Sequence, residues 1–117
     1  MKFQADNVEY WSRDGVESVL FANTEKALAL LMSNVPGTSD HYFEWNDQAN
    51  ACTNAVKTIQ FSGQELQIQL LPEASKQLGP AEFVVAFRIA EHNFIEISRC
   101  LNTIFRDKLT IRENGVQ

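Results

Sequence analysis

One stretch of the chain, residues 41–50, combines a strand pattern with a polar corner. Side chains that alternate in character along a β-strand point to opposite faces of the sheet. One face of this predicted strand carries His41, Phe43 and Trp45. The other carries Tyr42, Glu44 and Asn46. The segment from Asn46 to Asn50 is rich in amides and includes a carboxylate, which is typical of turns and hydrogen-bonded corners.

Two strand patterns precede this stretch. The segment Lys2 to Trp11 predicts a first strand, but its alternation slips between Ala5 and Val8, which requires a bulge or an irregular start. Asp14-Gly15 is a turn signal that can close a hairpin onto Val16 to Ala22. This second segment is apolar on both faces toward its end, so we expect it in the centre of a sheet.

A helix is predicted between the second strand and the polar loop that ends at Asp40. Asn23 or Thr24 could cap it, and Glu25 is favourable in its first turn. Its core-facing stripe falls at helical spacing and consists of Ala27, Leu28, Leu31 and Met32. Pro36-Gly37 would end this helix.

The second half of the chain begins with a clear hairpin. Val56 to Phe61 and Leu66 to Leu71 are joined by a turn at Ser62-Gly63. A two- or four-residue loop places the apolar side chains on one face: Ile59, Phe61, Leu66 and Ile68. Gln67 and Gln69 would then face water.

A short helix and a longer one follow, with a strand between them. Pro72 and Gly79 suit the start and end of the short helix, and Glu82 to Ile89 predicts the strand. Asn93 with Glu96 resembles a capping box at the start of the second helix. That helix has one apolar stripe: Phe94, Ile97, Leu101, Ile104 and Phe105.

These elements predict one α+β domain over residues 1–107. Residues 108–117 would form a polar tail or a short edge strand, since Leu109 and Ile111 alternate with polar neighbours. We expect a mostly antiparallel, twisted sheet of about six strands with two or three helices packed on one face. A chain of 117 residues suits one domain with one core.

Charge and composition narrow the classes of function. The net charge of −5 argues against a nucleic-acid partner, because phosphate binding requires clustered Lys and Arg. No apolar run is long enough for a membrane span, and the first residues lack a signal-peptide pattern, so we expect a cytoplasmic protein with no membrane partner. The two cysteines, Cys52 and Cys100, are expected to be free thiols in that compartment.

No catalytic, metal or cofactor signature is found. His41 and His92 do not lie at a metal-ligand spacing, and no glycine-rich phosphate loop is present. Glu44 and Asp47 would face opposite sides of a strand, so they cannot easily flank one substrate. A nucleophilic Cys52 with His41 as base would require direct contact and a lowered thiol pKa.

A protein-binding surface is better supported by the sequence. No Lys or Arg occurs between Lys26 and Lys57, whereas three carboxylates do. The candidate contact residues are Asp40, Tyr42, Glu44, Asn46, Asp47 and Gln48. Tyrosine is a frequent interface anchor, and acidic side chains favour a basic partner. Alternatively, Asn46 to Asn50 could only satisfy backbone groups in a tight corner.

The stretch Tyr-Phe-Glu-Trp-Asn-Asp-Gln-Ala-Asn, residues 42–50, resembles immunity protein family ten of bacterial polymorphic toxin systems. The resemblance continues through the hairpin, the Pro-Glu-Ala-Ser-Lys-Gln-Leu-Gly helix and the Leu-x-x-Ile-Phe end of the last helix, and covers about Met1 to Phe105. One difference is that the family is rich in glycine after Asn-Asp-Gln. This chain instead has Ala49, Ala51, Cys52 and Ala55.

The resemblance implies a non-enzymatic protein, encoded beside a secreted toxin, that binds and blocks the toxin domain inside the producing cell. A basic nuclease is one candidate for that toxin, and the immunity protein itself could be a monomer or a homodimer. Two other classes remain open. One is a homo-oligomeric structural module that uses an exposed sheet edge, and the other is a small enzyme that depends on Cys52 and His41.

Overall fold

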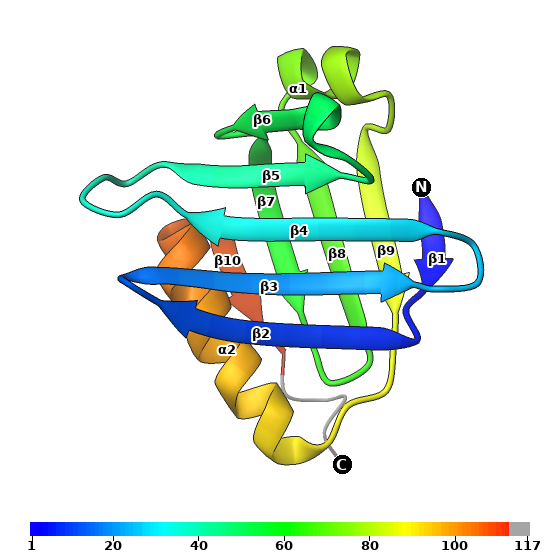
Figure 1. The fold of residues 1–117 in the computed structure, drawn as a ribbon, viewed down its shortest axis with the longest axis vertical. Helices are drawn as coiled ribbons and strands as arrows, with labels where there is room; N and C mark the ends of the chain where they lie inside the picture. Colours follow the sequence, from blue (N-terminus) through cyan, green and yellow to red (C-terminus); the bar gives the residue numbers. More distant parts are fainter. Residues whose placement is uncertain (113–117) are drawn as a thin grey trace.

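The computed structural model describes residues 1–112, and within them the chain forms ten β-strands and two α-helices (Figure 1). The strands make two five-stranded sheets that lie face to face, with the strands of one crossing those of the other. This confirms the predicted α+β class and the mainly antiparallel pairing. The prediction of one sheet with about six strands is wrong, because the chain divides its strands between two layers.

The first layer, sheet B, is built from consecutive strands, each antiparallel to the next. Its strands are β2 (Asn7–Arg13), β3 (Val16–Asn23), β4 (Leu28–Asn34), β5 (His41–Trp45) and β6 (Ala51–Thr53). The predicted Asp14-Gly15 turn joins β2 to β3, and both of its residues have positive φ. β3 lies between two neighbours, as its apolar sequence predicts.

The second layer, sheet A, has the order β1-β9-β8-β7-β10. Its strands are β1 (Lys2–Gln4), β7 (Val56–Phe61), β8 (Glu65–Leu70), β9 (Glu82–Ala86) and β10 (Leu109–Ile111). The edge strands β1 and β10 run parallel to their neighbours, and the other pairs are antiparallel. The predicted β7–β8 hairpin is confirmed, since Phe61 pairs with Leu66 and Ile59 with Ile68.

The predicted helix from Glu25 is wrong, because residues 28–34 form β4. This strand is central in sheet B, so Leu30 and Met32 are fully buried on one face while Leu31 is half-buried on the other. The single predicted strand from Lys2 to Trp11 is also wrong. The slip in its alternation is the point where the chain leaves sheet A after β1 and enters sheet B as β2.

The two helices do not pack on one face of a sheet, which corrects that prediction. α1 (Pro72–Leu78) lies at one end of the molecule near β6, and α2 (Glu91–Phe105) lies beside β10 and behind β2, β3 and β4 (Figure 1). The predicted capping box is wrong, since α2 begins at Glu91 after an extended Ala90 that has no side-chain cap. Short 3-10 helices occur at Gln48–Asn50 and Arg106–Lys108.

The core fills the space between the two sheets and α2. Phe21 of sheet B meets Phe61 of sheet A with ring centroids 6.4 Å apart, and Phe61 stacks on Phe94 of α2 at 5.3 Å. Arg99 of α2 also pairs with Glu17 of β3, with 2.9 Å between nitrogen and oxygen. No helix within residues 1–112 is long and apolar enough to cross a membrane. One core therefore packs against one face of each sheet, and no helix or strand of the described residues covers the other two faces.

Candidate functional site: the outer face of sheet B

No helix or strand of residues 1–112 covers the face of sheet B that points away from sheet A (Figure 1). The pairing register arranges its side chains in cross-strand rows. One row consists of Trp11, Ser18, Ser33, Tyr42 and Thr53. The adjacent row consists of Glu9, Leu20, Leu31, Glu44 and Ala51. We call the six larger side chains the sheet B patch: Glu9, Trp11, Leu20, Leu31, Tyr42 and Glu44.

The patch is apolar in the centre and carries aromatic and acidic side chains on its flanking strands. Trp11 of β2 is 42% exposed, which is high for such a large apolar side chain. Tyr42 stands on β5, three strand spacings away, or about 14 Å at the usual separation of paired strands. Between them Ser18 and Ser33 are buried, and their Oγ atoms are 2.8 Å apart. This hydrogen bond joins β3 to β4 in the middle of the row that links Trp11 to Tyr42.

Tyr42 and Glu44 form one unit on the open face. The Tyr42 hydroxyl donates a hydrogen bond to Glu44 Oε1, and this bond raises the pKa of Tyr42 to about 12, with burial adding to the effect. The phenol therefore stays protonated at neutral pH, and Glu44 keeps a second carboxylate oxygen for a partner. On the opposite flank, Glu9 Oε2 accepts a hydrogen bond of 2.7 Å from Asn7.

The other four predicted contact residues lie at the two ends of β5, and three of them form hydrogen bonds within the protein. Asn46, at φ 69°, donates its backbone N–H to Ala29 O at 2.8 Å, and its Oδ1 accepts the Ala29 N–H at 2.9 Å. Asp47 Oδ1 accepts the Ala49 N–H at 2.6 Å and caps the 3-10 helix. These bonds make the corner a structural element.

Asp40 and Gln48 complete the set of predicted contact residues. Asp40 Oδ1 accepts a hydrogen bond of 2.8 Å from Asn54 Nδ2 at the start of β5. Gln48 is exposed in the 3-10 helix at the other end. The structure therefore brings only Tyr42 and Glu44 of the predicted set into the patch, and it places the remaining four at the borders.

The pair Cys52 and His41 lacks the arrangement that a nucleophile and base require. His41 is 1% exposed, and its Nε2 accepts the backbone N–H of Val56 at 3.1 Å. Burial lowers the pKa of His41 to about 4, with the charge of Lys108 adding to the effect, and burial raises the pKa of the Cys52 thiol. No hydrogen bond joins the two side chains in the described part of the chain, so neither group activates the other.

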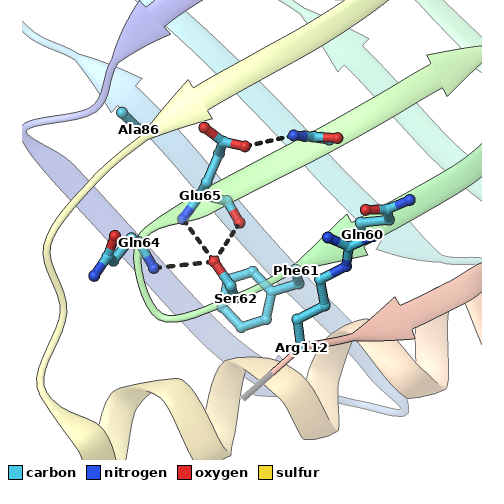
Figure 2. Close-up of a pocket in the computed structure, with 8 residues that line it drawn as sticks. Gln60, Phe61, Ser62, Gln64, Glu65, Ala86 and Arg112 are labelled. Carbon is cyan, nitrogen blue, oxygen red and sulfur yellow. Dashed lines mark hydrogen bonds between the residues drawn. The ribbon is translucent and has the colours of Figure 1, made fainter. Parts of the chain in front are cut away.

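A polar hollow of about 360 Å³ lies on the outer face of sheet A (Figure 2). Ser62 Oγ accepts the backbone N–H groups of Gln64 and Glu65 at 3.3 and 3.1 Å, so this hydroxyl holds the β7–β8 turn together. Gln67 Nε2 donates to Glu65 Oε1 at 2.5 Å. Three polar side chains of this hollow, Ser62, Glu65 and Gln67, are therefore already engaged in hydrogen bonds within the protein. Among residues 1–112 no three His, Cys, Asp or Glu side chains are placed to hold a metal ion.

The sequence did not reveal four members of the patch: Glu9, Trp11, Leu20 and Leu31. Leu20 lies in a segment that is apolar on both faces, so its face could not be assigned. Trp11 and Glu9 alternate correctly within β2, but the slip at Ala5 to Val8 obscured the face to which they belong. Leu31 was assigned to the stripe of a helix, because leucine and methionine also suit helical spacing. The signal that could identify the patch is the exposed tryptophan, which becomes informative only when the register places it beside Leu20, Leu31 and Tyr42.

Comparisons of the chain with protein-family models, curated proteins and solved structures gave no match. The sheet B patch is the best candidate for a binding site, because it exposes apolar and aromatic side chains on a paired, regular sheet.

Proposed function

We propose that the protein is an immunity-type protein that binds a cognate toxin domain through the sheet B patch and neutralises it by non-covalent contact. The observation that carries this proposal is the exposure of Trp11, at 42%, together with Tyr42, Leu20 and Leu31 on a sheet face that no helix or strand of residues 1–112 covers. The resemblance of residues 42–50 to an immunity family supports the choice of a toxin as the partner.

The contrast between the two open sheet faces supports a role in binding. The outer face of sheet A is polar and carries Thr58, Gln60, Gln67, Gln69 and Glu82. An antiparallel sheet that merely faces water has polar side chains of this kind. Aromatic residues are enriched in the buried centres of protein interfaces, where truncating one often costs about 2 kcal/mol or more. Trp11 and Tyr42 of the sheet B patch are aromatic residues of this kind.

The charges around the patch favour a basic partner. Glu9 and Glu44 flank the two leucines from opposite strands, and no Lys or Arg occurs between Lys26 and Lys57. Positive charge on the partner would increase the rate of encounter, and partners with negative charge would be disfavoured by repulsion. A basic nuclease domain fits this surface, and a complex of ordinary size would bury about 1,600 Å² in total.

The experiment is co-expression of the protein with the toxin domain encoded by the adjacent gene, followed by growth assays and a binding measurement. Trp11→Ala and Tyr42→Ala should each weaken binding by about 30-fold, which corresponds to roughly 2 kcal/mol. Gln67→Ala and Gln69→Ala, on the outer face of sheet A, are the matched controls and should bind normally. Full protection by the doubly substituted, folded patch variant would contradict the proposal, as would an adjacent gene that encodes no toxin.

A further inference from the structure

The two open sheets have four edge strands, and these edges differ in length. β1, β6 and β10 have three residues each, whereas β2 has seven. An edge strand presents unpaired N–H and C=O groups that can pair with another chain, so proteins usually shorten or cover such edges. Among the edge strands of residues 1–112, β2 is the one that is not short.

Two of the short edges are also covered by side chains. Gln77 of α1 donates a hydrogen bond of 3.1 Å to Ala51 O on β6. Asn23 donates one of 2.7 Å to Gln4 O on β1. Within residues 1–112 no side chain forms a similar bond to the backbone of β2, and the strand contains no proline and no shift of register. In the described part of the chain, β2 thus lacks both the short length of the other three edges and the side-chain cover of two of them.

The Asp14-Gly15 turn determines which backbone N–H and C=O groups of β2 point away from β3. Asp14 and Gly15 have φ of 53° and 81°, as a two-residue type I′ hairpin requires, so the flanking pair Arg13 and Val16 is hydrogen-bonded. Bonded and non-bonded pairs alternate along an antiparallel ladder. The backbone groups that point away from β3 therefore belong to Val8, Tyr10 and Ser12.

We propose that β2 accepts an extended segment of the toxin domain as an additional strand of sheet B. This inference rests on the proposed function and specifies how the partner is bound. Glu9 and Trp11 stand on β2, so the rows of the sheet B patch would continue directly onto the added strand. A basic side chain opposite Glu9 and an apolar one opposite Trp11 would match those rows.

A strand from a partner fits this edge better than a second copy does. Figure 1 shows the β7–β8 turn and the first turns of α2 extending past β2 in the layer behind it. Two copies paired through β2 about a two-fold axis would place both projecting layers in the same space. A single extended segment avoids this overlap, because it occupies only the layer of sheet B.

The test compares Ser12→Pro with Ser12→Ala in the full-length protein, with the toxin domain from the adjacent gene as the probe. Proline removes an outward N–H and is tolerated at a free strand edge, while alanine removes the same hydroxyl and keeps the N–H. Ser12→Pro should weaken binding at least tenfold, and Ser12→Ala should leave it within twofold of the original protein.

Amide hydrogen exchange on the unsubstituted protein gives an independent measurement. The amides of Val8, Tyr10 and Ser12 should become at least tenfold slower in the complex, whereas those of Glu9 and Trp11 are already protected by β3. Unchanged exchange at the three outward amides would overturn the strand addition. So would equal binding by the proline and alanine variants.

These outcomes separate the two proposals. If Trp11→Ala weakens binding and Ser12→Pro does not, the patch is the interface but no strand is added. If the toxin domain does not bind the unsubstituted protein, both proposals fail. Sedimentation of the isolated protein completes the test, since a dimer that Ser12→Pro dissociates would show that the edge belongs to a second copy.

Discussion

His41 of β5 accepts a hydrogen bond at Nε2 from the backbone N–H of Val56 in β7, over 3.1 Å, and thereby connects the two sheets. Only an unprotonated Nε2 can accept this bond. The ring is buried and lies 4.9 Å from the ring of Phe105. Burial, followed by the charge of Lys108, lowers the pKa of His41 to about 4, while Asp40 acts in the opposite direction.

The lowered pKa of the buried His41 ring predicts a loss of stability in mild acid. The unfolded histidine has a pKa of about 6.5, so the neutral ring stabilises the fold fully above that pH. The contribution is lost as the pH falls from about 6.5 to about 4, and should reach roughly 3 kcal/mol. Urea unfolding across this range measures the effect. His41→Gln can accept the same bond without titrating, so it should show a weaker pH dependence, and parallel curves would contradict the assignment.

The Asn46 corner should matter for stability and not for binding. Asn46→Ala loses the bond to the Ala29 N–H and places an alanine at positive φ, so we expect a cost of about 2 to 3 kcal/mol. Asn46→Gly loses only the bond and should cost about 1 kcal/mol. Thermal unfolding measures both. If either variant folds but binds the toxin domain much more weakly, Asn46 is a contact residue instead.

The carboxylates of the patch should act mainly on the rate of association. Glu9→Gln and Glu44→Gln should slow binding of a basic toxin domain several-fold at low salt, because each removes one attractive charge. The difference should disappear near 0.5 M salt, where charges are screened within a few ångströms. Stopped-flow binding at several salt concentrations measures this. Glu82→Gln, on the outer face of sheet A, should bind at the unsubstituted rate at every salt concentration.

The two thiols should be poorly reactive. Burial raises the pKa of Cys100 to about 11, and it also raises the pKa of the half-buried Cys52. At pH 8 a thiol reagent should therefore modify Cys52 slowly and Cys100 only after unfolding. Cys52→Ala should protect cells as well as the original protein does. Loss of protection by a folded Cys52→Ala protein would instead favour the enzyme that uses Cys52 and His41.

The sequence predicted most local structure where a pattern had a single interpretation. The β7–β8 hairpin, α1 between Pro72 and Gly79, and the buried stripe of α2 were all predicted correctly. β4 was not, because Leu28-Ala-Leu-Leu-Met is a good helix former and also suits a strand that is apolar on both faces. Its position between β3 and β5 decides the outcome, and that position depends on distant residues.

For the same reason, the division into two sheets could not be predicted from local sequence patterns. Lys2 pairs with Val84, and Leu109 pairs with Ile59, so each edge of sheet A joins parts of the chain that are far apart. Most of the sheet B patch could not be predicted from local patterns either. Tyr42 and Glu44 follow from alternation within one strand, but their neighbours Trp11 and Leu31 follow only from the register across the sheet.

The arrangement of sheet A also determines when the protein can complete its fold on the ribosome. Sheet B is made of residues 7–53 in sequence order, so its strands can pair as soon as they emerge. Sheet A cannot finish its border beside β7 until β10 (Leu109–Ile111) has emerged. Ribosome-stalled chains that end at residue 105 should therefore be cut by proteases more readily in β7 than in β3.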